Sequence, residues 1–243
     1  MILTKHGFLY DIVYLVKPDR VNEELKYSLR TVEKNFPHNS VWFYGGCPDG
    51  IQPDHHYYVD QEAINGPKWV KTTTMLRLAC ENERLTEWIW LFNDDFFITD
   101  PAPEAFEAIY HGSIDLRIEE IESERGGARS QYSSLLRQTR KLLMRAGMPT
   151  LNYATHTPLL INRECAIETM DKFPNFPMFR CLYGNMFEIG GIDQADVKIN
   201  DINEEWDGRS WCMSTSDTTF ESGRAGEFIR QIFRSPSKWE VLK

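Results

Sequence analysis

The sequence lacks the features of a membrane-spanning, secreted or disulfide-built protein. No apolar run reaches the roughly eighteen residues that a transmembrane helix needs, and the first eight residues lack the apolar segment of a signal peptide. The five cysteines are odd in number, widely scattered and form no Cys-x-x-Cys pair, so neither a disulfide framework nor a zinc or redox motif is indicated. We therefore expect a cytoplasmic protein with reduced thiols.

The sequence also lacks low-complexity stretches, internal repeats and any segment that reads as a linker. Its 243 residues are 42% hydrophobic and 13% aromatic, which is ample for a packed core. The net charge of −9 argues against a surface built wholly for nucleic acid. We expect a single domain over 1–243, with a charged loop and basic helix inserted around 117–147.

The most informative stretch is 88–98, where an apolar run meets two carboxylates. Residues 88–92 predict a strand buried on both faces, and Asn93, Asp94 and Asp95 follow at its mouth. Two ionised carboxylates beside an apolar interior need neutralising, and hard divalent metals take carboxylate oxygens. The alternative is that the pair only begins a turn or caps a helix. We expect a Mg²⁺ or Mn²⁺ site, with Asp95 as the first ligand and Asp94 as the second.

The segments before this stretch predict an α/β fold. Residues 9–16 and 40–44 have the composition of strands, and the helix between them has Asn22 as a candidate N-cap and Pro37 as a stop. A second helix over 68–80 leads to the strand at 88–92. This order predicts a Rossmann-type, mixed but mostly parallel central sheet flanked by helices, with right-handed crossovers. The loops at 16–19 and at Gly45-Gly46 would open on the carboxyl edge of that sheet.

The segment after this stretch combines charged and amphipathic sequence. We expect a short helix over 103–110, a mobile charged loop over 117–129 and an amphipathic helix over 131–146. One face of the last helix carries Arg137, Arg140, Lys141 and Arg145. Residues 125–145 hold six basic residues, including Arg125 and Arg129, and no acidic one. This face would bind a phosphate-bearing partner, or it would pair with acidic loops of the same protein.

Four polar residues nearer the end of the sequence are candidates for chemistry. His156 stands just before an apolar run at 159–161, where a histidine serves catalysis about as often as structure. Asp217 ends a Ser-Thr-Ser-Asp turn, where it would reach a ligand or cap the turn. Arg180 and Asn185 would position a substrate. Residues 188–207 are acidic and are expected to lie mostly on the surface.

Taken together, these blocks resemble known transferases. A βαβ unit followed by an apolar strand and an acidic pair resembles the GT-A glycosyltransferases, in which a DxD-type motif holds a divalent cation against the diphosphate of a nucleotide-sugar. The blocks at 11–14, 22–34, 91–97, 156–158 and 179–180 resemble those of Stealth-type sugar-phosphate transferases. The blocks at 93–97, 156–158, 214–217 and 236–240 are similar to small glycosyltransferase-like proteins of bacteriophages. The resemblance covers most of the chain in scattered blocks.

The resemblance implies a GT-A-like fold and metal-dependent transfer of a sugar from a nucleotide-sugar, with a UDP-sugar as the expected donor. Asp95 and Asp94 would hold Mg²⁺ or Mn²⁺, His156 or Asp217 would be the general base, and Arg180 would position a substrate. Donor and phosphate groups would be bound by Val16, Lys17, Asp19, Arg30, Gly45, Gly46, Lys71, Asn93 and Asp94.

The resemblance leaves several alternatives open. The acceptor would be a glycan or a hydroxymethylated base in phage DNA, the latter bound by the basic helix in the cytoplasm of the host. The loop at 16–20 lacks the Trp-Val-Asp-Gly character of the Stealth block, so transfer of a sugar or of a sugar 1-phosphate stays open. A non-catalytic phage protein that binds a nucleotide-sugar is the remaining alternative.

Overall fold

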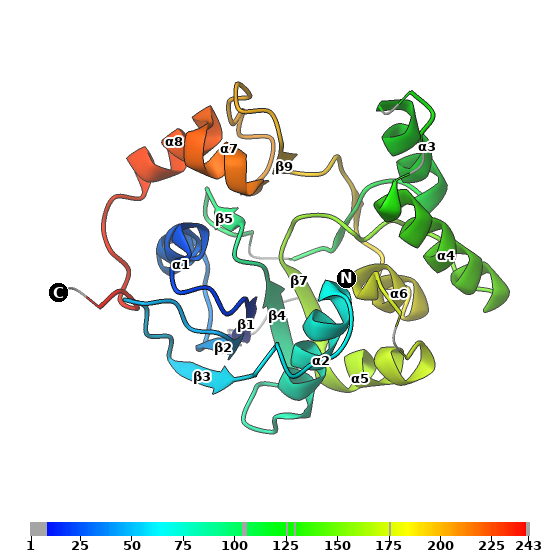
Figure 1. Ribbon diagram of the computed structural model, residues 1–243, viewed down its shortest axis with the longest axis horizontal. Coiled ribbons are helices and arrows are strands. Elements are labelled where there is room, and N and C mark those ends of the chain that lie inside the picture. The colour runs from blue at the N-terminus through cyan, green and yellow to red at the C-terminus, as the bar shows by residue number, and fades with distance from the viewer. Residues whose placement is uncertain (1–8, 104–105, 125, 129, 175, 242–243) are drawn as a thin grey trace.

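A five-stranded sheet in the order β3-β2-β1-β4-β7 forms the centre of the computed structural model, which describes residues 9–103, 106–124, 126–128, 130–174 and 176–241 (Figure 1). The strands are β1 (Asp11–Val16), β2 (Val41–Gly45), β3 (His55–Tyr58), β4 (Trp88–Phe92) and β7 (Leu159–Asn162). All neighbours pair in parallel except β7, which runs antiparallel to β4. The prediction of an α/β fold with a mixed, mostly parallel sheet is confirmed.

Helices flank this sheet, and shorter strands extend the molecule beside it. The helices are α1 (Glu23–Asn35), α2 (Lys68–Glu81), α3 (Ile114–Glu124), α4 (Gln131–Arg145), α5 (Arg163–Lys172), α6 (Phe179–Met186), α7 (Asp217–Ser222) and α8 (Arg224–Ile232). Strands β5 (Phe96–Ile98), β10 (Cys212–Thr215) and β9 (Lys198–Ile199) form a second sheet, and β6 (Ile109–Tyr110) pairs with β8 (Ile192–Asp193). Within the described ranges, none of the helices is long and apolar enough to cross a bilayer.

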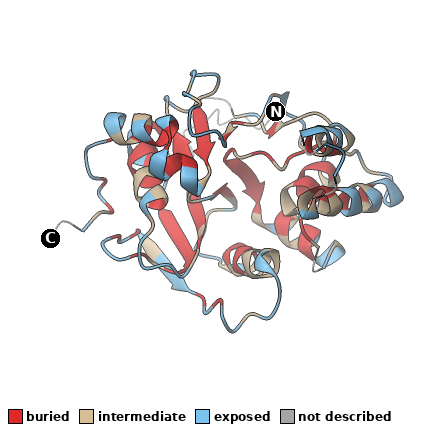
Figure 2. Cartoon of the chain, turned by 45° about the horizontal axis from the view of Figure 1, so that its top comes forward, coloured by how far each residue is buried: buried red, intermediate tan, exposed pale blue. Residues whose placement is uncertain are grey.

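The central sheet is buried on both faces, as the apolar strands predict. Ile12 and Tyr14 of β1 pack into the cluster that holds α1, whereas Val13 packs into the cluster that holds α2 and α5. All three are 0% exposed, so each apolar side chain stabilises the fold by roughly 1.5–3 kcal/mol. Figure 2 shows the buried strands between helices whose outer faces are exposed. The result is a three-layer α/β/α arrangement that presents the carboxyl ends of the parallel strands at one edge.

The cap of α1 connects the first βαβ unit to the acidic pair. The Asn22 side chain accepts a hydrogen bond from the Leu25 amide at 2.9 Å, as its N-cap position predicts. Its amide nitrogen donates to Asp94 Oδ2 at 2.8 Å. The residue that begins α1 therefore also fixes the carboxylate that follows β4.

The stretch 88–98 divides into two strands of different sheets. A turn at 94–95 separates β4 from β5, and β5 pairs antiparallel with β10 rather than continuing the central sheet. Asn93, Asp94 and Asp95 therefore lie at the junction of the two sheets, which is why their side chains reach different neighbours.

Two predictions about local structure are wrong. Residues 106–110, the described end of the helix expected over 103–110, are extended; β6 pairs with β8, and the Phe106 ring lies 4.4 Å from that of Trp90. Residues 104 and 105 lie outside the described residues. Most of the expected loop over 117–129 belongs to α3, because Ile114, Ile118 and Ile121 form a buried stripe at helical spacing.

Candidate functional site

A cleft lies at the carboxyl edge of the central sheet, between β1 and β4. From β1 the chain adds β2 and β3 on one side and β4 on the other, so the strand order reverses at this point. Open α/β sheets bind ligands at such a reversal. The cleft has a volume of about 580 Å³. Its polar lining includes Lys17, Asp19, Asn93 and Asp94 at the strand ends, with Lys68 and Lys71 from α2.

A smaller, acidic hollow of about 190 Å³ adjoins this cleft and shares Lys17 and Asp94 with it. Glu24 and Asp217 also line it. Burial, together with the nearby charges of Asp95, Asp94 and Asp217, raises the pKa of Glu24 to about 8. Asp94 in turn raises the pKa of Lys17. The hollow concentrates negative charge that favours a cation.

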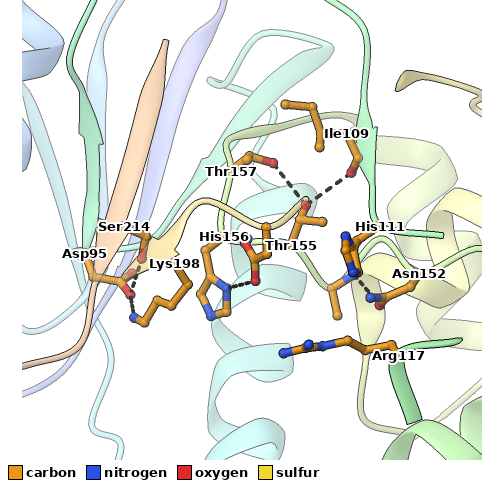
Figure 3. A network of polar contacts seen from close by, with 12 residues as sticks. Asp95, Ile109, His111, Arg117, Asn152, Thr155, His156, Thr157, Lys198 and Ser214 are labelled. Carbon is orange, nitrogen blue, oxygen red and sulfur yellow. Dashed lines mark hydrogen bonds and ion pairs between the residues drawn. The ribbon is translucent and has the colours of Figure 1, made fainter. Parts of the chain in front are cut away.

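Asp94 and Asp95 are held in different ways. Asp95 Oδ2 accepts hydrogen bonds from Lys198 Nζ at 2.5 Å and from Ser214 Oγ at 2.9 Å (Figure 3). The side chains of Asp95 and Lys198 are 14% and 17% exposed, so this is a largely buried ion pair. Asp94 lines both the cleft and the acidic hollow and accepts from the Asn22 amide. The geometry therefore favours Asp94 over Asp95 as the carboxylate that meets a ligand.

The carboxylates near Asp94 fit a divalent cation that is bound together with a substrate phosphate. Among the residues that the structure describes, no group of three or more His, Cys, Asp or Glu side chains is arranged as a metal site. A metal held by protein groups alone is therefore not indicated. Mg²⁺ is usually bound through one or two carboxylates together with substrate phosphates. Asp94 and Asp217, which line the same hollow, fit that pattern.

His156 forms a tight pair with Asp196, a residue that no sequence motif had singled out. The ring nitrogen Nδ1 lies 2.7 Å from Asp196 Oδ2, and Asp196 Oδ1 accepts from the His156 amide at 2.9 Å. Arg117 extends toward this pair in Figure 3. Because an ionised carboxylate only accepts, Nδ1 carries the proton and Nε2 of a neutral ring is left as a base. The pair has the form of a general base, but His156 lines neither the cleft, the acidic hollow nor the apolar groove beside Arg180, so its role stays a prediction.

The Asp196 carboxylate should make stability sensitive to acid. Burial alone would raise its pKa, but the hydrogen bond and charge of His156, with Arg117 nearby, lower the pKa to about 2. Its contribution of about 2 kcal/mol is present above the ordinary aspartate pKa near 4 and is lost as pH falls toward 2. We expect urea unfolding to show a smaller loss of stability between pH 5 and pH 3 for Asp196→Asn than for the natural chain. Equal losses in the two proteins would contradict this role.

Arg180 lies where an apolar groove meets the site. One guanidinium nitrogen donates to the Thr155 carbonyl at 2.7 Å, the other donates to the Thr157 carbonyl, and the group lies 5.7 Å from the centre of the Phe96 ring. Its Nε is buried without a hydrogen-bond partner in the described structure. Burial lowers the pKa of Arg180 to about 10, so it stays charged at neutral pH. Its role as a residue that positions a substrate stays a prediction.

Two residues predicted to bind a ligand, Arg30 and Asn185, make hydrogen bonds within the fold. Arg30 makes two hydrogen bonds of 2.7 Å to Glu240 and anchors the C-terminal segment. Asn185 is 1% exposed, and its amide bonds both backbone groups of Leu151. Neither residue lines the cleft, the acidic hollow or the apolar groove beside Arg180. The hypothesis that they contact the donor or the acceptor finds no support in this geometry.

Gly45 and Gly46 allow close approach, but to the protein's own backbone. A Cβ on Gly45 would lie 2.2 Å from the Val16 carbonyl oxygen, and one on Gly46 would lie 2.3 Å from that of Lys17. The Val16 side chain is 0% exposed, and its carbonyl accepts from the Gly46 amide at 3.0 Å. These glycines pack the ends of β1 and β2 together and so shape the cleft without lining it.

The basic face of α4 is partly neutralised by α3. Arg137 pairs with Glu122 at 2.6 Å and Arg140 with Asp115 at 2.5 Å. Lys141 and Arg145 are exposed, whereas Arg125 and Arg129 lie outside the described residues. Of the two alternatives that the sequence leaves open, Arg137 and Arg140 therefore follow the second: they pair with acidic residues of the same protein.

Asp196 and Lys198 were missed because 188–207 was expected to lie mostly on the surface. Most of this segment is indeed exposed, but at β9 Val197 and Ile199 are 0% exposed and alternate with the two polar residues. Alternation of period two is the signal of a half-buried strand and was present in the sequence. The high acidity of the surrounding segment obscured it.

Comparisons with known proteins give weak structural likenesses. The chain is similar to the galactosyltransferase LgtC in complex with donor and acceptor sugar analogues, with a TM-score of 0.47 and 10% identity over 94% of this chain and 96% of that chain. For an active-site mutant of LgtC the TM-score is 0.40, with 16% identity over 78% and 74% of the two chains. For apo GlyE of Streptococcus pneumoniae TIGR4 it is 0.35, with 10% identity over 77% of this chain and 45% of that chain. No protein-family model and no curated protein matches the chain. Likenesses at this level carry no argument about activity.

Proposed function

We propose that the chain transfers a sugar from a nucleotide-activated donor to an acceptor hydroxyl, as a GT-A-type glycosyltransferase does. The observation that carries this proposal is the cleft at the strand reversal. Asp94, Lys17, Lys68 and Lys71 all line this cleft, and Lys71 also contacts Glu62 of the same lining at 3.4 Å. Lysines that offset phosphate charge, next to a carboxylate that accepts a cation, suit a nucleoside diphosphate.

The charge that develops on the leaving diphosphate defines the roles of the cleft residues. Lys17, Lys68 and Lys71 would offset that charge directly. Asp94, with Asp217 across the acidic hollow, would hold Mg²⁺ or Mn²⁺, which supplies further neutralisation of the diphosphate when bound. We now place Asp95 behind the site as the partner of Lys198, in contrast to the hypothesis that it is the first metal ligand.

Deprotonation of the acceptor hydroxyl is the second chemical task. We assign it to Nε2 of His156, with Asp196 holding the ring by Nδ1. The proton leaves the hydroxyl as its oxygen forms the bond to the sugar carbon, and the bond from that carbon to the diphosphate oxygen breaks. Asp217 is exposed and lines the acidic hollow together with Asp94. We therefore assign it to binding the cation rather than to the role of general base.

The acceptor class remains part of the proposal. The ion pairs of Arg137 and Arg140 leave less unpaired basic surface on α4 for the backbone of DNA. A modified base in DNA would have to be bound through the remaining charges of α4, Lys141 and Arg145. Binding to DNA would then fall steeply with rising salt.

The test is thermal unfolding with UDP-sugars in the presence and absence of Mn²⁺. A donor at about 100 times its dissociation constant stabilises the folded protein by about 2.7 kcal/mol, and we expect such a shift only when Mn²⁺ is present. Stabilisation by UDP-sugars that does not depend on the metal would contradict the assigned role of Asp94.

Product analysis separates the alternatives. Sugar transfer releases UDP, whereas a Stealth-type transfer of sugar 1-phosphate releases UMP. A protein that binds the nucleotide-sugar without turning it over releases neither product. Absence of binding to every nucleotide-sugar tested would overturn the proposed function itself.

A further inference from the structure

A groove beside the nucleotide cleft has a distinct chemical character. It has a volume of about 460 Å³ and shares Lys68, Thr72 and Asn93 with the cleft. Its lining is mainly apolar and includes Trp69, Leu76, Tyr132, Leu135 and Phe179. This volume suits a group of small-molecule size rather than a folded partner.

The groove is basic, although the protein as a whole is acidic. Its lining contains Lys68 and Arg180 and no aspartate or glutamate. The net charge of the chain is −9, so a lining of this kind is a local exception. An anion would meet favourable charge in this groove and unfavourable charge in the acidic hollow.

The carboxylates nearest to Arg180 are already engaged. Asp196 and Asp95 both favour its charged form, but Asp196 accepts from His156 and Asp95 from Lys198. The described structure contains no ion pair of Arg180 with a carboxylate; its bonds go to two backbone carbonyls. Each terminal nitrogen of a guanidinium carries two hydrogens, so the bonds to the two carbonyls leave hydrogens of Arg180 unused.

We propose that this groove is the acceptor subsite, and that the acceptor carries a planar aromatic ring next to a phosphate. The ring would lie among the aromatic side chains Trp69, Tyr132 and Phe179, and the phosphate would meet Arg180, with Lys68 at the opening shared with the cleft. The assignment as acceptor subsite rests on the proposed function. The binding of an aromatic phosphate does not, and it can be measured without a donor.

The experiment titrates the full chain with phenyl phosphate, phenol, inorganic phosphate and octyl phosphate, using ligand-detected NMR. Phenyl phosphate is expected to bind at least about tenfold more tightly than phenol or inorganic phosphate, because only it engages both the ring site and the cation. Equal affinity for phenyl phosphate and phenol, or for phenyl phosphate and inorganic phosphate, would overturn the proposal. Tighter binding of octyl phosphate would do so as well, since it would indicate an aliphatic acceptor.

Two variants locate the binding in the groove. Arg180→Gln should remove the preference for phenyl phosphate over phenol. Leu135→Glu places a carboxylate in the groove and should weaken phenyl phosphate at least about tenfold. Leu142→Glu is the matched control, because Leu142 lies two turns further along α4 and does not line the groove. Equal binding by the Leu135 and Leu142 variants would place the ligand elsewhere.

The two proposals can fail separately. If none of the nucleotide-sugars tested binds but phenyl phosphate shows the expected preference, the groove is an aromatic phosphate site and the proposed transferase function is wrong. If UDP-sugars bind with Mn²⁺ but phenyl phosphate does not bind, the transferase function stands and this acceptor class is wrong.

Discussion

Replacing Arg30 by methionine is expected to lower the free energy of unfolding by about 3 kcal/mol, because the buried Glu240 carboxylate then keeps only the longer contact with Lys26, at 3.7 Å, and its hydrogen bonds from Ser237. The side chains of Arg30 and Glu240 are 8% and 7% exposed, and they share two hydrogen bonds of 2.7 Å. Arg30 also donates to the carbonyls of Phe233 and Arg234, so the variant loosens the whole C-terminal segment from α1. Urea unfolding at neutral pH measures the loss.

An exposed arginine provides the matched control for this measurement. Arg20 pairs with Asp49 at 3.1 Å, but their side chains are 85% and 65% exposed. Arg20→Met should change the stability by less than about 1 kcal/mol. Similar losses in both variants would show that the buried pair contributes no more than a surface pair. Loss of nucleotide binding by Arg30→Met with unchanged stability would restore Arg30 as a ligand residue.

Acid adds an independent check on the same pair. Burial raises the pKa of Glu240, but the bonds from Arg30 and the Ser237 amide outweigh burial, so the pKa lies below the ordinary glutamate value. A depressed pKa contributes stability above the pKa of the unfolded chain, and that contribution is lost as pH falls through the folded value. Removing Arg30 removes the main cause of the depression, so Arg30→Met should lose less stability on acidification than the natural chain.

The sheet could be predicted from sequence because its signals are local. The apolar strands β1, β2 and β4, the Asn22 cap and the helix that ends before Pro37 each depend on residues that are close in the chain. The order of these elements then implies parallel pairing and a reversal between β1 and β4. This reasoning located the carboxyl edge of the sheet, and with it Lys17, Asp19, Asn93 and Asp94 in one cleft.

The parts of the site that were missed depend on contacts between distant residues. Lys198 reaches Asp95 across 103 positions in the chain, and Asp196 reaches His156 across 40. No local pattern specifies either pair. Lys198 and Asp196 both lie in the segment 188–207, whose acidity suggests an exposed surface. The sequence does not show the ion pair of Arg30 for the same reason, since its partner Glu240 lies 210 positions away. A charged residue in the sequence shows what it can bind, but only the fold shows whether a neighbour has already bound it.

Replacing Asp94 by asparagine is expected to reduce sugar transfer at least about 10²-fold, which corresponds to about 3 kcal/mol of transition-state stabilisation. The reason is that Asp94 lines both the nucleotide cleft and the acidic hollow, where it would hold the cation that meets the diphosphate. The asparagine oxygen can still accept from the Asn22 amide, so the stability should change by less than about 1 kcal/mol. The Mn²⁺-dependent shift in thermal unfolding with a UDP-sugar should disappear together with the activity.

The same substitution at Asp95 is the natural comparison, because the two carboxylates are adjacent in the chain but contact different residues. Asp95→Asn removes the charge that faces Lys198, which is 17% exposed, and should cost about 1–3 kcal/mol of stability. Asp94→Asn should thus remove activity from a stable protein, whereas Asp95→Asn should destabilise a protein whose Mn²⁺-dependent binding survives. The reverse pattern would restore Asp95 as the first metal ligand and would place Lys198 as a cation that the metal displaces.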